Sequence, residues 1–248
     1  MQSVKKVINV LEYVIYSPKP VSINQAAKDL NMSVSNVYKY LSELYKCGLL
    51  IKSNDKTYTP SLKVVEYSST ILKKISIRGL AHPFLVDLMA KTGQTVHLGI
   101  REGSKGVYVD KVEGPNSLPM VSKIGASFDL YSTALGKAML AFLEDFEINK
   151  YLKAVRLVKK AKNTLANQDT LRKDLEEIKK RHFSIDMEEN EDGIICIGAP
   201  IFDFNGSVIA AVSLSTIANK MDEQLVNEYT YKVLLCAKEI SKLAGYKV

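Results

Sequence analysis

The side chains best suited to chemistry gather around a predicted hairpin in the last third of the chain. Asn205-Gly206 is a strong signal for a tight turn between two strands. Counting outward from a two-residue turn pairs Cys196 with Ser215 and Gly198 with Ser213. A thiol, two hydroxyls and a bare glycine then share one face of an otherwise apolar hairpin. That face is either the floor of a small polar pocket or a surface turned toward solvent.

The same residues raise the question of catalysis. Cys196 with His97 could act as nucleophile and base, and the two together with Asp186 could bind zinc. The sequence contains no nucleophile elbow, no paired zinc motif and no cofactor fingerprint. A buried thiol and a histidine packed in the core are the simpler explanation of these two residues. We therefore expect no enzyme and no cofactor, and keep a cysteine- or zinc-dependent enzyme as the alternative.

A second candidate site lies at residues 129–137, where Ser132 or Thr133 can cap a helix. The first backbone amides of that helix belong to Ala134, Leu135 and Gly136, and such amides bind carboxylates well. The stretch is not a nucleotide-binding loop, because it lacks the upstream glycine and the hydroxyl residue that would hold magnesium. It predicts either an anion-binding helix start or a helix capped for structural reasons.

Capping signals at the N-terminus predict three short helices. The first covers about residues 3–16 and ends before Pro18, and Ser22 with Gln25 forms a capping box for the second. A tight turn over residues 31–33 follows, with Ser33 as N-cap of a third helix that reaches Lys46 and stops at Gly48. Two short helices joined by so tight a turn form a helix-turn-helix.

The third helix is expected to bury Val37, Leu41 and Leu44, which recur at helical spacing. Its opposite side carries hydroxyl, amide, phenol and ammonium groups, which can donate to phosphates and base edges in a major groove. An ordinary solvated helix face would look the same. The predicted DNA-contacting residues here are Ser33, Ser35, Asn36, Tyr38, Lys39, Ser42 and Lys46.

Two short strands around residues 53–55 then predict the wing of a winged helix. Lys52 and Lys56 flank its tip and complete the set of predicted DNA contacts. A stripe of Leu62, Val65, Leu72 and Ile75 follows on an amphipathic connecting helix. We expect a DNA-binding domain at residues 1–60, a linker and dimerisation helix at 61–77, and a second domain at 78–248.

Charge supports this division of the 248-residue chain. Residues 1–77 hold 11 lysines against five acidic residues, whereas the remainder holds 23 basic and 22 acidic residues. An excess of lysine in one small module suggests a polyanionic partner, although a solvated lysine surface is the simpler explanation. Three scattered cysteines and the absence of a signal-peptide or membrane-spanning pattern predict a soluble, cytoplasmic protein.

The second domain alternates strand-like and helical runs, which predicts an α+β fold. Strands are expected at 95–101, 106–112, 120–124, 183–187, 194–204 and 207–214. Helices are expected at 80–91, 133–142, 168–181 and 222–243.

Several segments, in order, resemble signatures of the IclR family of bacterial transcription regulators. They are residues 132–138, 186–189, 193–203 and 208–215, together with the N-terminal winged helix. The resemblance implies a GAF-like effector domain, a helical linker that dimerises the DNA-binding domains, and often a tetramer. It also implies a pocket for a small organic acid, lined by Ala134, Leu135, Asp186, Ile194, Cys196, Ser213 and Ser215. Lys39 and Asn36 depart from residues frequent in the family, which puts the operator sequence in doubt but not the binding mode.

Overall fold

The computed structural model describes residues 2–74, 76–115 and 122–247. Its backbone divides into two compact units, residues 1–74 and 75–248, and we describe each by itself. Family resemblance and periodicity predicted an N-terminal helix-turn-helix unit and a C-terminal α+β unit, and both are confirmed. In the described chain no helix is long and apolar enough to cross a membrane.

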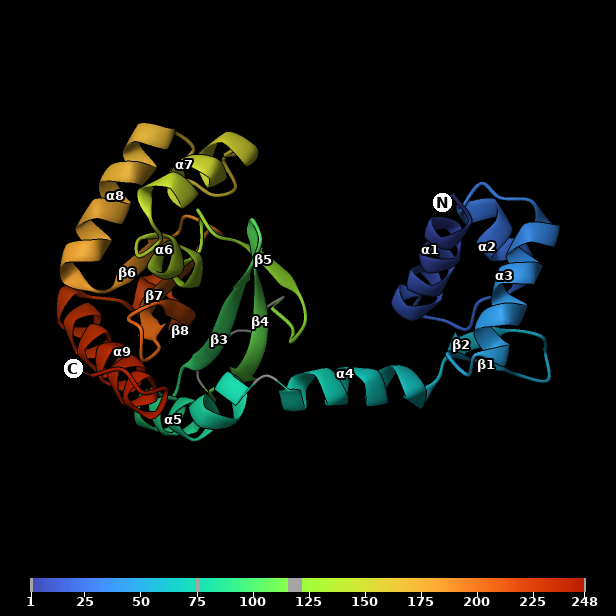
Figure 1. Cartoon of the computed structure of the whole chain (residues 1–248), viewed down its shortest axis with the longest axis horizontal. Helices are drawn as coiled ribbons and strands as arrows, with labels where there is room; N and C mark the ends of the chain where they lie inside the picture. Colours follow the sequence, from blue (N-terminus) through green and yellow to red (C-terminus); the bar gives the residue numbers. More distant parts are fainter. Residues whose placement is uncertain (1, 75, 116–121, 248) are drawn as a thin grey trace. The chain divides into compact units, whose positions relative to one another are not determined.

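The first unit contains a three-helix core, a two-stranded wing and one further helix (Figure 1). Its apolar core includes Val10 and Val14 from the first helix, Val37 and Leu41 from the third, and Tyr58 from the wing. The elements are α1 (Gln2–Tyr16), α2 (Ile23–Asp29), α3 (Val34–Lys46), β1 (Leu50–Lys52), β2 (Tyr58–Pro60) and α4 (Leu62–Lys74).

Local signals place the helix ends as predicted, with one difference in the capping box. The Ser22 hydroxyl accepts a hydrogen bond from the Gln25 amide, but the Gln25 side chain bonds to Asp29 instead of returning to Ser22. Ser33 caps α3 by accepting from the Asn36 amide at 3.4 Å. Gly48 follows α3 with φ +75°, a left-handed conformation that favours glycine.

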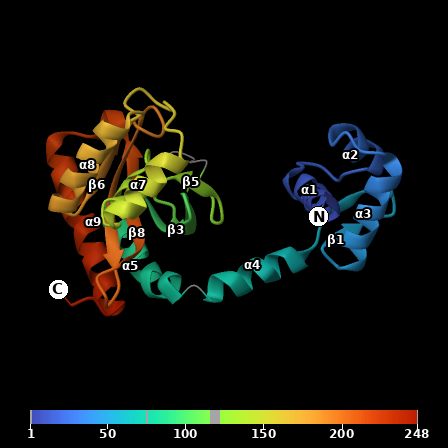
Figure 2. The same ribbon diagram turned by 45° about the horizontal axis from the view of Figure 1, so that its top comes forward.

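The second unit contains one antiparallel sheet between two layers of helices (Figure 2). Strand order is β5-β4-β3-β8-β7-β6, so the predicted hairpin of β7 and β8 lies inside the sheet, with β8 beside β3 at its centre. The strands are β3 (Thr95–Glu102), β4 (Lys105–Val112), β5 (Ser127–Asp129), β6 (Ser184–Met187), β7 (Ile194–Phe202) and β8 (Val208–Ile217).

The helices cover the two faces of this sheet in separate groups. Helices α5 (Ser76–Thr92) and α9 (Glu223–Leu243) pack on one face around Leu85, Val212 and Val233. Helices α6 (Ala134–Leu140), α7 (Asp145–Ala154) and α8 (Gln168–Arg181) belong to a second apolar cluster on the other side. A short 3-10 turn, Ala218–Lys220, precedes α9.

Several boundaries correct the prediction. The predicted strand at 120–124 begins outside the described residues, and Ser122 and Ile124 lie in loop and turn structure, whereas β5 follows at Ser127. Helix α7 was not predicted at all. In the wing, Lys56 belongs to the turn and not to the second strand, because its φ of +63° interrupts extended structure.

The central hairpin has the predicted register but a longer turn. Asp203 and Ser207 face each other across the turn, with Asn205 and Gly206 between them. A register shift between Ile201 and Phe202 then absorbs the extra residue. Beyond this bulge Cys196 pairs with Ser215 and Gly198 with Ser213, as expected.

Candidate ligand cavity and nucleic-acid interface

Two rows of mostly polar residues cross the sheet of the second unit, and five of their eight members line a cavity. Neighbouring residues in each row are cross-strand partners, so their side chains share one face. The first row is Asp186, Cys196, Ser215 and Thr95. The second is Ser184, Gly198, Ser213 and His97.

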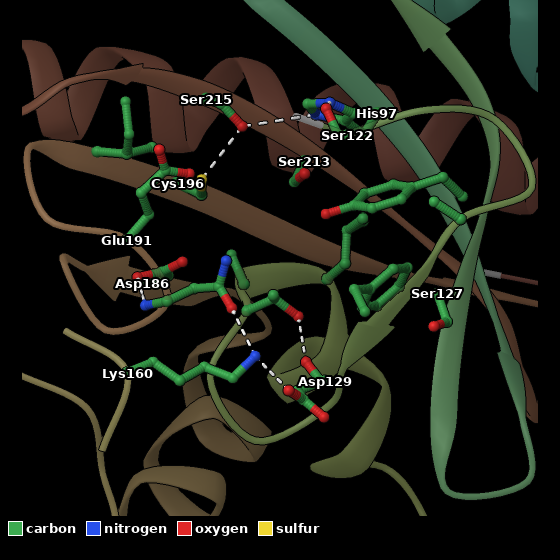
Figure 3. A pocket seen from close by; sticks show the side chains of 18 of the residues that line it. His97, Ser122, Ser127, Asp129, Lys160, Asp186, Glu191, Cys196, Ser213 and Ser215 are labelled. Atoms are coloured by element: carbon green, nitrogen blue, oxygen red, sulfur yellow. Dashed lines mark hydrogen bonds and ion pairs between the residues drawn. The ribbon is translucent and has the colours of Figure 1, made fainter. Parts of the chain in front are cut away.

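The cavity above these rows has a volume of about 260 Å³ (Figure 3). Strands of the sheet, the start of α6 and the three loops that carry Ser122, Lys160 and Asn190 supply its walls. Seven of the eight predicted effector-binding residues line it: Ala134, Leu135, Asp186, Ile194, Cys196, Ser213 and Ser215. The polar face of the hairpin therefore lies in a pocket, and the alternative that it faces solvent is wrong.

Gly136 is the predicted residue that does not line the cavity. Its amide donates to the Thr133 hydroxyl at 3.1 Å, so the helix cap already uses the donor that was assigned to an anion. A Cβ on Gly136 would lie 2.2 Å from Leu130 Cα, which shows that glycine is needed there for close packing. A Cβ on Gly198 would similarly lie 2.8 Å from the backbone of Ala134. The two glycines allow the start of α6 to pack closely against Leu130 and against strand β7. Ala134 and Leu135 therefore remain at the cavity.

A chain of hydrogen bonds runs along one side of the floor (Figure 3). The half-buried Cys196 thiol donates to the Ser215 hydroxyl at 3.1 Å, which lies 3.5 Å from His97 Nδ1. His97 Nε2 lies 2.8 Å from the Ser122 hydroxyl. Burial, with a smaller effect of Lys111, lowers the pKa of His97 to about 3, so the ring is neutral at physiological pH.

This geometry bears on the thiol chemistry considered above. Burial first, and then the nearby Asp186, raise the pKa of the Cys196 thiol. Ser215 separates it from His97, and a neutral thiol beside a neutral imidazole is not an activated nucleophile. Among the described residues, no group of three or more His, Cys, Asp or Glu side chains could hold a metal ion.

Asp186 is the most perturbed carboxyl group in the cavity wall. It is 2% exposed, and its Oδ1 accepts from the amides of Glu189 at 2.7 Å and Asn190 at 3.2 Å. Burial raises its pKa to about 7, although the two amides and the charge of Lys137 act in the opposite direction. Asp186 therefore exchanges a proton near neutral pH.

The loop after Asp186 is anchored by a buried ion pair. Lys137 of α6 is 1% exposed and donates to Glu189 Oε1 at 2.6 Å and to Asp174 of α8 at 2.7 Å. A buried charge requires partners of this kind, because desolvation would otherwise be prohibitive. The pair holds the loop that carries Asn190 at the cavity and donates two backbone amides to Asp186.

Sequence reasoning missed several lining residues. His97 was considered as a catalytic base, a zinc ligand or a core residue but not as an effector contact, and Tyr108, Ser122 and Asn190 were not identified. Lys105, Lys160 and Asp129 bring charge to the site and were also missed as binding residues. Alternation along β3 and β4 marks His97 and Tyr108 as sharing a sheet face, but nothing in the sequence indicates that the segment with Lys160 folds back over them.

The predicted DNA-contacting face lies on α3 and the wing of the first unit. Val37, Leu41 and Leu44 are buried as expected, so the polar side of α3 is turned outward. Ser42 is half-buried, and the remaining predicted contacts are exposed: Ser33, Ser35, Asn36, Tyr38, Lys39, Lys46, Lys52 and Lys56.

The lysines on this face differ in whether they form an ion pair. Lys46 donates to Glu43 at 2.9 Å, so its charge is partly neutralised by an acidic residue one turn earlier on the same helix. Within the described chain, Lys39, Lys52 and Lys56 form no ion pair. The Lys52 ammonium lies 5.8 Å from the centre of the Tyr58 ring. These three lysines keep their charge available for phosphates.

Comparison with known proteins settles the family. A model of the bacterial transcriptional regulator IclR C-terminal domain matches residues 69–242, and one of the IclR helix-turn-helix domain matches residues 3–52. The chain belongs to the IclR family. It is thus a DNA-binding transcriptional regulator with a C-terminal effector domain.

Individual members of the IclR family match along nearly the whole chain. The transcriptional regulator XynR of Escherichia coli is 30% identical over 99% of this chain and 98% of its own. The Thermotoga maritima IclR crystal structure is 46% identical, with a TM-score of 0.88 and coverage of 99% and 100%. An IclR homologue from Microbacterium hydrocarbonoxydans, complexed with 4-hydroxybenzoate, has a TM-score of 0.83 with coverage of 98% of both chains, but is only 15% identical and shows the fold alone.

Proposed function

We propose that a small organic acid binds in the cavity of the second domain and modulates the affinity of this regulator for its operator. The cavity carries the proposal, since it is lined by the hydroxyls of Ser213 and Ser215, the thiol of Cys196 and the apolar side chains of α6. Its volume of about 260 Å³ suits a small ligand. The 4-hydroxybenzoate complex of a distant relative supports an acid as the class of ligand.

Operator binding is assigned to the outward face of α3 and to the wing. The hydroxyls and amide at its start, from Ser33 to Asn36, suit base edges, and Lys39, Lys52 and Lys56 suit phosphates. Because the lysines are exposed and form no ion pair within the described chain, they can follow the DNA backbone. Binding should therefore depend steeply on salt.

A dimer would join the two activities. A two-fold dimer places two α3 helices at half-site spacing, and an effector that favours one arrangement changes the fit to DNA. Leu62 and Val65 on α4 are 81% and 60% exposed, as expected for a dimerisation helix, whereas Ile75 and the side chain of Leu72 lie outside the described residues. We retain residues 1–60, 61–77 and 78–248 as DNA-binding, linker and effector segments.

We infer further that the protein is not an enzyme and that it acts in the cytoplasm, where its DNA lies. The raised pKa of Cys196 and the neutral His97 argue against thiol catalysis. The curated relatives carry the names of transcriptional regulators or repressors. Incubating the protein with a bound acid and finding the acid unchanged would support a purely sensory site.

Two measurements test this function. A thermal-shift screen of carboxylic acids should find at least one that raises the melting temperature. Fluorescence anisotropy with DNA from upstream of the gene should show tighter binding than random DNA of equal length, and the same acid should change that affinity. Equal affinity for both DNAs at moderate salt would refute specific regulation.

The oligomeric proposal has its own test. Light scattering at micromolar concentration should give the mass of a dimer or a tetramer, because exposed apolar residues on α4 need a partner surface. A charged substitution, Val65→Glu, should shift the mass toward a monomer. A monomeric wild-type protein would contradict the two-fold mechanism.

A further inference from the structure

Two lysines and one aspartate form a charged cluster at the wall of the cavity. Lys105 of β4 and Lys160, from the segment between α7 and α8, both line the cavity and both form an ion pair with Asp129 at the end of β5. Figure 3 shows Lys160 and Asp129 meeting beside the pocket. The two lysine side chains are 50% and 32% exposed, against 14% for Asp129. Each ammonium has three donors, so donors remain free after the contact with Asp129.

The charges in this cluster do not balance. Burial would raise the pKa of Asp129, but hydrogen bonds and charges from Lys105 and Lys160 outweigh it and lower the pKa, so the carboxylate is ionised at neutral pH. Two ammoniums against one carboxylate leave an excess positive charge within this cluster. Asp186 and Glu191 also line the cavity, but neither pairs with these lysines within the described chain.

Lys160 is held in place by the fold. Its backbone amide donates to the Thr164 hydroxyl at 2.9 Å, and that hydroxyl donates to the Glu189 carbonyl at 2.5 Å. Lys162, in the same turn, forms an ion pair with Glu188 at 2.7 Å. The turn is thus attached to the loop that carries Asn190, whose side chain lies 3.4 Å from the Lys160 ammonium. A charge positioned before the ligand arrives loses little entropy on binding.

We propose that Lys105 and Lys160 bind the anionic group of the effector, and that Asp129 occupies both lysines when the effector is absent. This inference rests on the proposed function and adds where the acid group lies. At the start of α6, the earlier candidate, Thr133 already uses one of the three amides, that of Gly136, whereas the two lysines bring full positive charges. The ligand class is a carboxylate with a second polar group, which reaches the hydroxyls of Ser213 and Ser215 on the floor.

Substitutions of the lysines and of Asp129 should change acid binding in opposite directions, which distinguishes this binding role from a structural one. Lys160→Met and Lys105→Met each remove an attractive charge and should weaken acid binding about tenfold, as expected for a charge-assisted hydrogen bond. Asp129→Asn removes the competing carboxylate and should tighten acid binding several-fold, roughly 3- to 10-fold by the same reasoning. If the ion pairs only held the wall together, all three substitutions would weaken binding.

Lys159→Met is the matched control, because it removes the same charge from the residue next to Lys160, which is exposed and does not line the cavity. The probes are acetate and 4-hydroxybenzoate, each paired with its neutral carboxamide, and affinities are measured by calorimetry or by thermal shift. Wild type should prefer each acid to its amide by about tenfold, and the Lys160 and Lys105 variants should lose most of that preference. Lys159→Met should keep it.

The outcomes distinguish failure of this inference from failure of the proposed function. If neither probe nor any acid of the screen binds wild type, the effector proposal fails and the cluster has no ligand to hold. If an acid binds wild type and both lysine variants with the same affinity and the same preference over its amide, the cluster is not the anion site. Weaker acid binding by Asp129→Asn would overturn the competing role of Asp129. Lys160→Gln and Lys105→Gln, with melting curves, show whether a loss comes from misfolding.

Discussion

The DNA-binding face and the cavity hold their polar groups in opposite ways. Lys39, Lys52 and Lys56 project into solvent and form no ion pair in the described chain. In the cavity, Asp186 is buried against two backbone amides, and Lys160 is paired with Asp129. The face can lie along a long, regular polyanion, whereas the cavity presents fixed groups to one small molecule. Salt should therefore dominate binding at the first site, and shape and hydrogen bonding at the second.

Destroying the core of one region should leave the other intact. Leu41 is fully buried at the centre of the winged helix, and Leu41→Ala should lower the free energy of unfolding of that unit by about 2 to 5 kcal/mol. Anisotropy should show operator binding lost or severely weakened, while calorimetry shows an unchanged affinity for a confirmed acid. Loss of acid binding as well would mean that the two units do not fold independently.

Asp186→Asn removes a buried charge from the cavity and should change how the stability of the fold depends on pH. The folded-state pKa of Asp186, about 7, is above its ordinary value of 3.8, so its carboxyl group stabilises the fold at low pH and that stability is lost as pH rises through 7. The amide cannot ionise, so the variant should gain roughly 2 to 4 kcal/mol over wild type at pH 8 and nothing at pH 4.

Melting curves across this pH range check the sign. His97 gives stability the opposite pH dependence, because its folded-state pKa, about 3, is below the ordinary 6.5. The fold is therefore destabilised as pH falls below 6.5. Since wild type and the variant share His97, the difference between their curves isolates Asp186. A gain at pH 4 that disappears at pH 8 would contradict the assignment.

Removing the hydroxyls of the floor should weaken effector binding without touching DNA. The double substitution Ser213→Ala with Ser215→Ala should cost about 1 to 3 kcal/mol of binding free energy, because ligand groups would then be desolvated without partners. Titration calorimetry with a confirmed acid measures the loss, and operator affinity without acid serves as the internal control. Unchanged acid affinity would place the ligand elsewhere.

The smallest expected effect concerns a single phosphate contact. Lys39→Ala should reduce operator affinity and flatten the dependence of log affinity on log salt by about one unit. Lys63→Ala is a useful comparison, because that ammonium already donates to the Cys47 carbonyl at 2.7 Å. An unchanged salt slope for Lys39→Ala would show that Lys39 does not contact a phosphate.

The same contrast explains what the sequence could predict. In the winged helix the signals are local: Ser22 and Ser33 cap helices next to them, and Gly48 ends α3, so the elements follow from short windows. The floor of the cavity was also within reach, since one hairpin register brings Cys196 and Ser215 together. A bulge absorbed the error in the turn and left that register intact.

The walls of the cavity could not be predicted in this way. Lys160 reaches the site through hydrogen bonds from its turn to residues near 189, and no periodicity marks such a contact. Helix α7 was missed although the residues it buries, Ile148, Tyr151 and Leu152, recur at helical spacing, whereas β5 is only three residues long. Gly136 was assigned to a ligand because its amide begins a helix, but its tight contact with Leu130 is visible only in three dimensions.

The central claim is that one chain holds two separate, coupled sites. The most direct test measures operator affinity by anisotropy with and without a confirmed acid, for wild type, Lys39→Ala and the Ser213→Ala, Ser215→Ala double variant. We predict that the acid shifts the operator affinity of wild type. Lys39→Ala should bind DNA more weakly but respond to the acid by the same factor. The double variant should bind DNA normally and lose the response at an acid concentration that saturates wild type. An acid response that survives in the double variant, or one that disappears in Lys39→Ala, would contradict the account.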